Sequence, residues 1–499
     1  MKILIDTNIF IHREDDDVVP KSLRKLEKTL RENNHKILIH PLSEKEIRND
    51  GDVERRARNE SRIETYERIG FPAYPTDDDS DFRQEVPEGQ KINDVVDNAI
   101  LYSVYDDLVD FLITEDRGIH KKALDIGLEE RVFTIEEGWD FFSPDEPELY
   151  GPLSLERTTL GELDLSDPIF DSLKRDYSRF ESWAQEKSER TSWVTYNTDR
   201  SLGALLVLKP NEVEALGASH SLGRSRRMKI STLKVAEHRW GSKIGELLVS
   251  ISIREAVHHE LDEIYLTYYD DGTDDYFVEL IRSYGFEYAA EEKDGESVFL
   301  KRLTPGPGHN PDPIGITKNY YPSFYDGTEV DKYLTPIRPT YHDRLFTSYQ
   351  NRQTSLVEFD GEFHTEGNAI KKAYLTGAKN YQIEPGDILL FYRSVDEKAV
   401  TSIGVCEEAY FNITDTDKIQ KLVGKRSVFT ADEIAERAES GTNVILFRWH
   451  FDLDECISYK NLLDSGVLSG PLQVMQGISE EDYEYIKEQG GLDGRFALD

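Results

Sequence analysis

The sequence predicts a multi-domain protein built of α/β domains, and three observations indicate this fold class. The chain has 499 residues, too many for one ordinary hydrophobic core. Short apolar runs alternate with stretches of helical periodicity in its first two segments, whereas its last segment is rich in strands. A stretch dense in Pro and Gly, "LTPGPGHNPDPIG", separates the two kinds of pattern. We therefore expect domains at 1–145, 151–303 and 318–499, with a linker at 304–317.

The composition indicates a folded protein with a strongly acidic surface. There are 97 acidic and 60 basic residues, for a net charge of −37, and the acidic excess is spread along the chain. Such a field repels nucleic acid at ordinary salt, so a nucleic-acid partner requires a local basic patch or strong screening. We interpret the diffuse acidity as adaptation to high salt, which points to a halophilic source.

The absence of certain sequence features restricts the cellular location of the protein and the roles of its cysteines. No apolar run approaches the roughly 20 residues of a membrane helix, and the start does not follow the order of a signal peptide. We therefore expect a cytoplasmic protein. Cys406 and Cys456 are the only cysteines, so neither a disulfide framework nor a Cys-based zinc site is indicated.

The first segment reads as a parallel sheet flanked by helices. Its apolar runs are "KILID", "KILIH", "FLITED" and "VFTI", and its helical stretches are "SLRKLEKTLREN" and "INDVVDNAILYSVYD". Asp6 ends the first run, and Asp116 follows the run "FLIT" in the same way. Because ligand sites form at the carboxyl ends of parallel strands, both carboxylates can face one cleft.

Further carboxylates occur in the same segment. Glu46 lies in "PLSEKEI", and Asp94 and Asp97 lie three residues apart on one face of an expected helix. Converging carboxylates repel each other, and Mg²⁺ or Mn²⁺ removes that repulsion. A bound metal ion can activate water and stabilise the charge that develops on a phosphate, as a nuclease requires. Taken singly, each acid also reads as a solvated group of an acid-rich protein.

Residues 1–145 resemble the PIN-domain family, through "ILIDTNIFI", "PLSEKEI", "VVDNAIL" and "LITEDRGIHKKA". PIN domains are metal-dependent nucleases that act mostly on RNA. The resemblance implies an acidic catalytic site of Asp6, Glu46, Asp97 and Asp116, with Asp6, Asp94, Asp97 and Asp116 as candidate metal ligands. It also implies that Thr7 and Asn8 shape the first loop. Glu44 competes with Glu46 for its place, and Asp94 competes with Asp97.

The second segment carries a possible phosphate-binding turn. Expected strands are "ALLVLKP", "MKISTLKV", "EIYLTYYD" and "SVFLKRL", and expected helices are "IGELLVSISIREAVHHE" and "DYFVELIRSY". A strand ends at Val235, a turn containing Gly spans 238–245, and a helix follows. Backbone amides at such a helix start bind phosphate oxygens, and Arg239 and Lys243 add positive charge. A simple strand-to-helix turn is the alternative.

The order of these elements resembles the GNAT acetyltransferase family, whose pyrophosphate loop for acetyl-CoA lies at this position. The residues that the resemblance assigns to the cofactor are Leu233, Val235, Arg239, Gly241, Lys243, Ile244 and Gly245. The sequence departs from the pattern of the GNAT family in two ways, so the fold is a stronger expectation than the catalytic activity. Trp240 and Lys243 replace two residues of the usual loop, and Ile281 stands where many members have a Tyr that protonates the leaving thiolate. Tyr276 or Tyr284 could supply the acid or simply pack, and Glu237 and His238 are candidates for the base.

The third segment looks like the PUA-like superfamily, in the branch with ASCH and EVE domains, through "IEPGDILLFY" and "IGVCEEAYF". That resemblance implies a β-barrel with helices that recognises RNA or a modified base. The candidate basic and aromatic surface consists of Lys371, Lys372, Tyr374, Tyr392 and Arg393. In the alternative interpretation the tyrosines belong to the core and the lysines are solvated.

Together the three resemblances predict an RNA-directed protein. The third domain would recognise RNA, the first would cut it, and the second would transfer an acetyl group or sense acetyl-CoA. Two alternatives remain open: an acetyltransferase with an inactive PIN domain, and a non-enzymatic regulatory protein of toxin–antitoxin type. The sequence identifies neither the RNA nor the acetyl acceptor.

Overall fold

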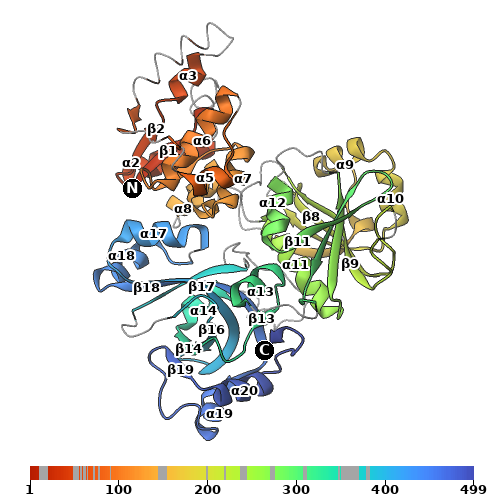
Figure 1. Cartoon of the computed structure of the whole chain (residues 1–499), viewed down its shortest axis with the longest axis vertical. Coiled ribbons are helices and arrows are strands. Elements are labelled where there is room, and N and C mark those ends of the chain that lie inside the picture. The colour runs from red at the N-terminus through yellow and green to blue at the C-terminus, as the bar shows by residue number, and fades with distance from the viewer. Residues whose placement is uncertain are drawn as a thin grey trace. The chain divides into compact units, whose positions relative to one another are not determined.

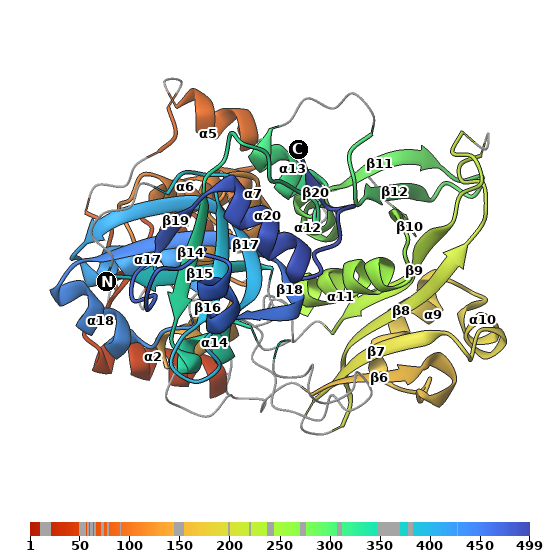
Figure 2. The ribbon, with the colours of Figure 1, turned by 90° about the horizontal axis from the view of Figure 1, so that it is seen from below.

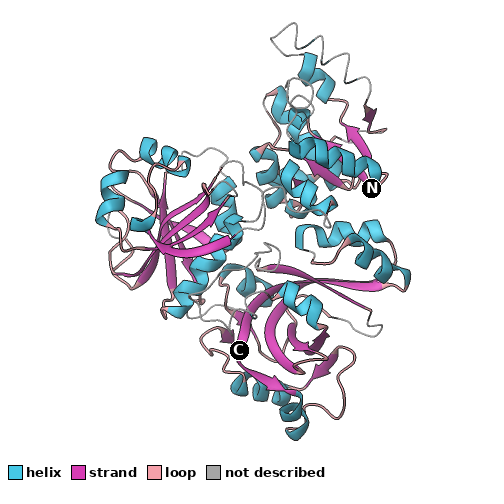
Figure 3. Ribbon diagram, turned by 180° about the vertical axis from the view of Figure 1, so that it is seen from behind, coloured by secondary structure: helices cyan, strands magenta, loops and turns pink. Residues whose placement is uncertain are grey.

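The structure is a computed structural model, and it divides the chain into two compact units. Unit 1 consists of Met1–Leu149, Gly272–Leu280 and Gln420–Lys425, and unit 2 of Tyr150–Asp271, Ile281–Ile419 and Arg426–Asp499. The described residues are 1–9, 21–48, 56, 59, 63, 66–70, 74–76, 79–89, 91–143, 154–197, 200–218, 221–236, 244–269, 276–306, 312–346, 349, 370–377, 383–426 and 428–499. The sheets and helices of the structure agree with the expected multi-domain α/β class (Figure 3). The domain boundaries within unit 2 stay a prediction.

Unit 1 is built on a five-stranded parallel sheet in the order β3-β2-β1-β4-β5. Strands β1 and β2 are labelled in Figure 1. The strands are β1 Lys2–Ile5, β2 Lys36–Ile39, β3 Glu67–Arg68, β4 Phe111–Ile113 and β5 Val132–Phe133. The helices are α2 Lys21–Glu32, α3 Ser43–Arg48, α5 Ser80–Glu85, α6 Ile92–Tyr105, α7 Arg117–Asp125 and α8 Ile135–Phe142. All four apolar runs expected as strands are therefore strands of one sheet.

Alternation along β1 decides where Asp6 faces. Ile3 and Ile5 belong to a core cluster that includes Leu26 of α2 and Trp139 of α8. Leu4 belongs to the opposite cluster, which contains residues of α6 and α7. Because successive side chains of a strand point to opposite faces, Asp6 continues the Leu4 series and faces the side covered by α6 and α7.

Unit 2 contains a seven-stranded sheet in the order β11-β12-β10-β9-β8-β7-β6. The strands are β6 Ser154–Thr159, β7 Thr191–Tyr196, β8 Leu202–Glu212, β9 Arg227–Val235, β10 Glu263–Tyr268, β11 Phe286–Glu291 and β12 Ser297–Arg302. The helices are α9 Asp171–Asp176, α10 Phe180–Glu186, α11 Ile244–His258 and α12 Tyr276–Ser283, of which Tyr276–Leu280 is assigned to unit 1. Helix α11 packs beside β8 and β9 (Figure 2). Among the described strands of this sheet, β9 and β10 form the parallel pair.

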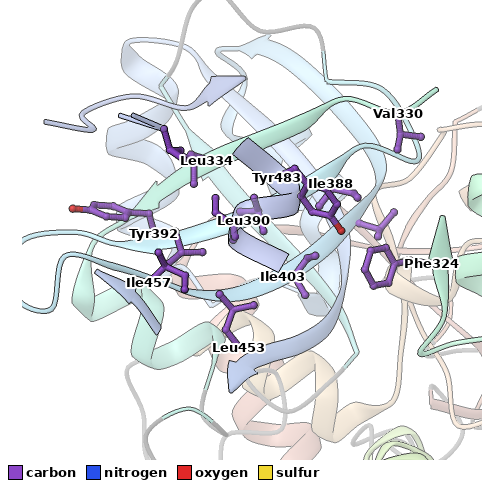
Figure 4. Close-up of a cluster of buried hydrophobic side chains, with 14 of the residues drawn as sticks. Phe324, Val330, Leu334, Ile388, Leu390, Tyr392, Ile403, Leu453, Ile457 and Tyr483 are labelled. Atoms are coloured by element: carbon purple, nitrogen blue, oxygen red, sulfur yellow. The ribbon is translucent and has the colours of Figure 1, made fainter. Parts of the chain in front are cut away.

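A six-stranded sheet follows, in the order β15-β18-β17-β16-β14-β19, and β13 and β20 form a small parallel sheet. The strands are β13 Phe324–Tyr325, β14 Lys332–Ile337, β15 Lys371–Thr376, β16 Ile388–Arg393, β17 Ala399–Ile413, β18 Thr442–Ser458, β19 Gln476–Ile478 and β20 Ala497–Leu498. The helices are α13 Pro313–Asn319, α14 Pro339–Leu345, α17 Thr416–Val423, α18 Ala431–Glu439, α19 Tyr459–Asp464 and α20 Glu480–Gln489. Leu334, Leu390 and Ile403 meet Tyr483 of α20 in a buried cluster (Figure 4).

One expectation about the linker is wrong. The Pro and Gly density of 304–317 predicts an absence of regular structure, yet Pro313–Asn319 forms helix α13. Pro313 occupies the first turn of this helix, where a backbone N–H has no intrahelical acceptor and where the fixed φ of Pro suits the helix. No helix within the described ranges is long and apolar enough to cross a membrane.

Candidate functional site

Asp6 is a buried carboxylate held by two short hydrogen bonds. Its side chain is only 3% exposed, at the carboxyl end of β1. Oδ1 accepts a hydrogen bond from the Thr7 amide at 2.6 Å, and Oδ2 accepts one from Thr114 Oγ1 at 2.6 Å. The main chain is fixed as well, since the Asp6 amide donates to the Ile113 carbonyl at 3.0 Å. Asp6 is therefore placed by β1 and β4 together.

Thr114 connects Asp6 to Asp116. Its hydroxyl oxygen also accepts a hydrogen bond from the Asp116 amide at 2.9 Å. The Asp116 carboxylate in turn caps α7, because Oδ1 accepts from the Ile119 amide at 3.0 Å. A Cβ at Gly118 would lie 3.1 Å from that same oxygen, so Gly leaves room for the Asp116 side chain. The two strand-end acids thus share one supporting hydroxyl.

The structure distinguishes Glu46 from its competitor Glu44 on helix α3. Glu44 forms ion pairs with Arg48 and Arg68, and so takes part in a structural contact. Glu46 instead faces the acids. Burial raises its pKa, the nearby Thr7 side chain lowers it, and the charge of Asp116 raises it again. Glu46 is therefore the residue of this helix that lies near the other carboxylates.

A similar distinction separates Asp97 from Asp94 on α6. Asp94 Oδ2 accepts a hydrogen bond from the Lys91 amide at 3.2 Å, which caps the start of the helix. Asp97 lies one turn further along and is half-buried. Burial, followed by the charges of Asp6 and Asp116, raises its pKa to about 8, while nearby Lys122 lowers it. Asp94 therefore has a structural role at the helix start, and its expected role as a metal ligand stays a prediction.

The pKa values show that the carboxylates form one electrostatic cluster. Burial, together with the charges of Glu46 and Asp116, raises the pKa of Asp6 to about 7 against the lowering effect of the hydrogen bonds from Thr114 and Thr7. We call Asp6, Glu46, Asp97 and Asp116 the acid cluster. Asp6 directly follows β1, Glu46 and Asp97 lie on α3 and α6, and Asp116 directly precedes α7, so residues up to 110 positions apart are brought together. A buried group of this kind favours protons or a cation.

Further polar atoms near the carboxyl ends of β1 and β2 are buried without a hydrogen-bond partner among the described residues. They are Asn8 Oδ1, His40 Nε2 and Ser43 Oγ. His40 follows β2 directly, as Asp6 follows β1, and the strands are paired in register up to Ile5 and Ile39. His40 is fully buried, and burial lowers its pKa to about 4. Such orphaned atoms indicate a site that takes polar ligands or water.

The oxygen-only donor set of the acid cluster matches the ligands that Mg²⁺ and Mn²⁺ take in proteins. Within the described ranges, however, no three His, Cys, Asp or Glu side chains already form a group that could hold a metal ion. The chemistry of the donors therefore fits a hard cation, whereas their present spacing does not.

In unit 2, the parallel pair β9 and β10 separates at one end. Pairing runs from Met228 with Ile264 to Ile230 with Leu266. Beyond this point β9 continues to pair with β8 as far as Val235, and β10 continues to pair with β12 as far as Tyr268. Beyond this point, within the described residues, the backbone groups on the facing edges of β9 and β10 form no ladder hydrogen bonds with each other.

Several expected cofactor residues border this opening. Leu233 and Val235 are half-buried on the diverging end of β9, and Ile244 and Gly245 open helix α11. The remaining candidates, Glu237, His238, Arg239, Gly241 and Lys243, together with Trp240, lie outside the described residues. Whether the turn contacts a phosphate stays a prediction.

The candidate acids for acetyl transfer differ in their surroundings. Ile281 is fully buried, as its apolar side chain requires. Tyr284 is 1% exposed, and its hydroxyl donates to Glu246 Oε2 at 2.7 Å. Tyr284 therefore behaves as a buried packing aromatic with a satisfied hydroxyl. The side chain of Tyr276 lies outside the described part of the chain.

The residues expected to form an RNA-binding surface in the third segment are buried. Lys371, Lys372, Tyr374, Tyr392 and Arg393 are all at most 8% exposed. Tyr392 and Tyr374 belong to hydrophobic clusters, and Arg393 forms ion pairs with Asp343 and Asp396. Strand alternation places these side chains inside because the sheet buries both of its faces. These residues therefore cannot stack on an exposed base as expected.

Two residues of the acid-cluster region were not foreseen from the sequence. The sequence "LITED" could have indicated Thr114, since its hydroxyl lies two positions before Asp116 at the end of a strand and can contact the end of the neighbouring strand. His40 carries a signal in "KILIH", because it ends a strand in the same way as Asp6 ends "KILID". In both cases the polar residue directly follows an apolar run, which is where a parallel sheet places its ligand edge.

Comparisons with known proteins give weak likenesses. A scan against models of protein families found no match, and a search of curated proteins found none either. Among solved structures, ASCH from Zymomonas mobilis is similar over 32% of this chain and 94% of its own, at 10% identity and a TM-score of 0.23.

Acetyltransferase structures are also similar to part of the chain. A GNAT family acetyltransferase from Elizabethkingia anophelis with acetyl-CoA bound covers 30% of this chain and 98% of its own, at 14% identity and a TM-score of 0.21. The PaiA N-acetyltransferase from Thermoplasma acidophilum in complex with coenzyme A covers 30% and 99%, at 14% identity and a TM-score of 0.22. TM-scores this low decide nothing about fold or function, and these likenesses give no support to the PIN-domain resemblance of residues 1–145.

Proposed function

We propose that unit 1 is a metal-dependent ribonuclease whose catalytic centre is the acid cluster. The observation that carries the proposal is the convergence of Asp6, Glu46, Asp97 and Asp116, whose burial and mutual repulsion raise the pKa values of Asp6 and Asp97 to about 7 and 8. Folding brings these charges together at a cost in stability, and a divalent cation would offset that cost. Burying such a group of carboxylates only for packing would be unfavourable.

Asp6, Asp97 and Asp116 would hold the cation, and Glu46 would lie beside it. When bound, the ion would supply an activated water and neutralise charge on the phosphate. Because the carboxylates are not yet spaced as a metal group, the proposal requires that they move closer when the ion binds. Thr114 and the Thr7 amide would keep Asp6 ionised and oriented during this step, since both donate to its oxygens.

Cations beside the acid cluster favour a phosphate-bearing substrate. Helix α7 begins directly after Asp116, and its first turns carry the cations Arg117, Lys121 and Lys122, of which Lys121 also pairs with Glu279 at 3.8 Å. Lys122 reaches α6, where its Nζ donates to Asn98 Oδ1 at 2.8 Å. In a chain of net charge −37, a local group of this kind is what a polyanionic substrate requires. RNA is the substrate class that the PIN-domain resemblance implies.

The test is cleavage of mixed cellular RNA by the full chain in Mg²⁺ or Mn²⁺, at low and at molar salt. Asp6→Asn and Asp116→Asn should each abolish metal-dependent cleavage and leave the fold intact. Glu44→Gln is the matched control, because Glu44 lies on the same helix as Glu46 but pairs with Arg48 and Arg68. Equal cleavage by the parent and both Asp variants would refute the assignment.

A second candidate function is binding of acetyl-CoA by unit 2, with N-acetyl transfer as the activity. The separation of β9 from β10 favours it, because the freed edges and the start of α11 together offer backbone amides to a ligand with amide and pyrophosphate groups. Calorimetry with coenzyme A tests the binding step. Absence of binding by the folded parent chain would remove this candidate, and the acetyl acceptor is not identified by these observations.

A further inference from the structure

A cluster of buried charged side chains in the six-stranded sheet is not explained by either proposed function. Arg448 of β18 is 2% exposed, and its Nε donates to Glu407 Oε1 at 2.5 Å. Arg426 Nη1 donates to the other oxygen, Oε2, at 3.3 Å. Lys371 of β15 lies directly opposite Arg448 in the antiparallel register and is also buried. Three cations therefore surround one carboxylate.

The sheet geometry directs Glu407 toward these cations. The pairing of β17 with β18 shifts between Cys406 and Glu408, so Glu407 is an extra residue at a β-bulge. A bulge turns a side chain away from the regular alternation. Burial by itself would raise the pKa of Glu407, but Arg448, Arg426 and Lys371 lower it well below its ordinary value. Glu407 is thus a fixed anion that orients Arg448.

Glu407 does not satisfy the whole Arg448 guanidinium. Arg448 Nη1 is buried and has no hydrogen-bond partner. His450 follows two positions later on β18, at a second shift of the β17/β18 register, and lies close enough for the charges of Arg448 and Glu407 to act on its ring. It is 2% exposed, its Nδ1 donates to the Pro322 carbonyl at 2.8 Å, and its Nε2 also has no partner. A buried guanidinium N–H without an acceptor is costly, so the two neighbouring orphaned atoms indicate a ligand between them.

We propose that Arg448, with Lys371, Arg426 and His450, forms an enclosed binding site for a phosphate group. A phosphate supplies acceptor oxygens for Arg448 Nη1, and in its protonated form it also supplies an O–H for His450 Nε2. Arg is the side chain best suited to hold such a group, because its planar N–H donors match phosphate oxygens. The site belongs to the β-rich part of unit 2 and does not depend on the acid cluster.

This site assigns Lys371 a role that differs from the surface contact with RNA that the sequence predicts. Lys371 was predicted to contact RNA phosphates from outside, whereas it is 8% exposed and faces Arg448 across the strand pair. An enclosed cation of this kind can hold a single phosphate group, but it cannot follow a polymer backbone. The ligand class is therefore a free phosphate ion or a small phosphomonoester.

Equilibrium dialysis of the full chain against radiolabelled inorganic phosphate tests the proposal. The buffer contains EDTA, which prevents metal-bridged binding at the acid cluster, and its ionic strength is held constant with potassium chloride. Dialysis continues until the two chambers no longer change, because an enclosed site exchanges slowly. We expect one saturable site in the parent, weakened at least about tenfold in Arg448→Gln and in Lys371→Gln.

Arg227→Gln is the matched control. Arg227 is buried as well, at 5% exposed against 2% for Arg448, but its guanidinium donates to Glu263 and to two backbone carbonyls. Binding should survive this change. Displacement of the label by adenosine 5′-monophosphate would identify a phosphomonoester as the ligand, and retention would identify the free ion. No saturable binding by the parent, or unchanged binding by both Arg448→Gln and Lys371→Gln, would overturn the proposal.

Discussion

Replacing Asp6 by Asn should stabilise unit 1 at alkaline pH, although the same change should abolish metal-dependent cleavage. Asn has nearly the shape of Asp, and it can still accept from the Thr7 amide and exchange a hydrogen bond with the Thr114 hydroxyl. The change therefore removes the buried negative charge and keeps the packing. A gain in stability that depends on pH would show that the acid cluster is held together against repulsion.

The size of the effect follows from the pKa of Asp6, which burial and its acidic neighbours raise to about 7. In the unfolded chain the value is about 3.9. Between pH 5 and pH 6 the folded state thus holds nearly one proton more than the unfolded state, and the difference falls to about half a proton at pH 7. Stability then falls as pH rises, at first by about 1.4 kcal/mol per unit and in total by about 2.7 kcal/mol between pH 5 and pH 8.5, and it levels off above about pH 8. The free energy of unfolding of Asp6→Asn should not fall in this way as pH rises.

Hydrogen exchange followed by mass spectrometry measures the effect locally in the full chain. Peptides that contain β1 and β4 report the opening of the strands that hold Asp6. Parent and variant are compared at the same pH, so the intrinsic exchange rate cancels. With EDTA present, the ratio of parent to variant opening should grow about 100-fold between pH 5 and pH 8.5. Peptides of the six-stranded sheet serve as the internal control.

Excess Mg²⁺ at pH 8.5 should restore protection of β1 and β4 in the parent and have little effect in Asp6→Asn. A ratio of parent to variant opening that does not change with pH would refute the reasoning, because the buried carboxylate would then carry no repulsive charge in the folded state. A ratio that changes with pH but does not respond to Mg²⁺ would retain the electrostatic account and contradict the metal-dependent function.

Three further predictions follow from other observations. Thr114→Val should lower the free energy of unfolding measured with urea by about 1–3 kcal/mol, because it leaves Asp6 Oδ2 and the Asp116 amide without their buried partner; an unchanged value would contradict the supporting role of this hydroxyl. Gly245→Asp should weaken coenzyme A binding in calorimetry, since it places a negative side chain at the start of α11; equal affinity would exclude a pyrophosphate contact there. The thermal midpoint should rise from low to molar potassium chloride, where the Debye length is about 3 Å and the −37 charge is screened; a flat or falling midpoint would contradict the high-salt interpretation of the acidic surface.

The sequence by itself determined the secondary structure that carries the acid cluster. Apolar runs such as "KILID" and "FLITED" became β1 and β4, because hydrophobic periodicity is a local property of the chain. It also placed Asp6 and Asp116 at strand ends. In a parallel sheet those ends share one edge, so their proximity could be expected without knowledge of any side-chain contact.

Only the tertiary structure decided between residues that are equivalent in local pattern. Glu44 and Glu46 lie two positions apart, yet Glu44 pairs with Arg68 while Glu46 joins the acids. Asp94 and Asp97 share a helix face, but Asp94 caps the helix start. Lys371 reads as a solvated cation until its strand is paired with β18, which buries it opposite Arg448. Burial and choice of partner depend on residues far away in the sequence, and no local pattern contains that information.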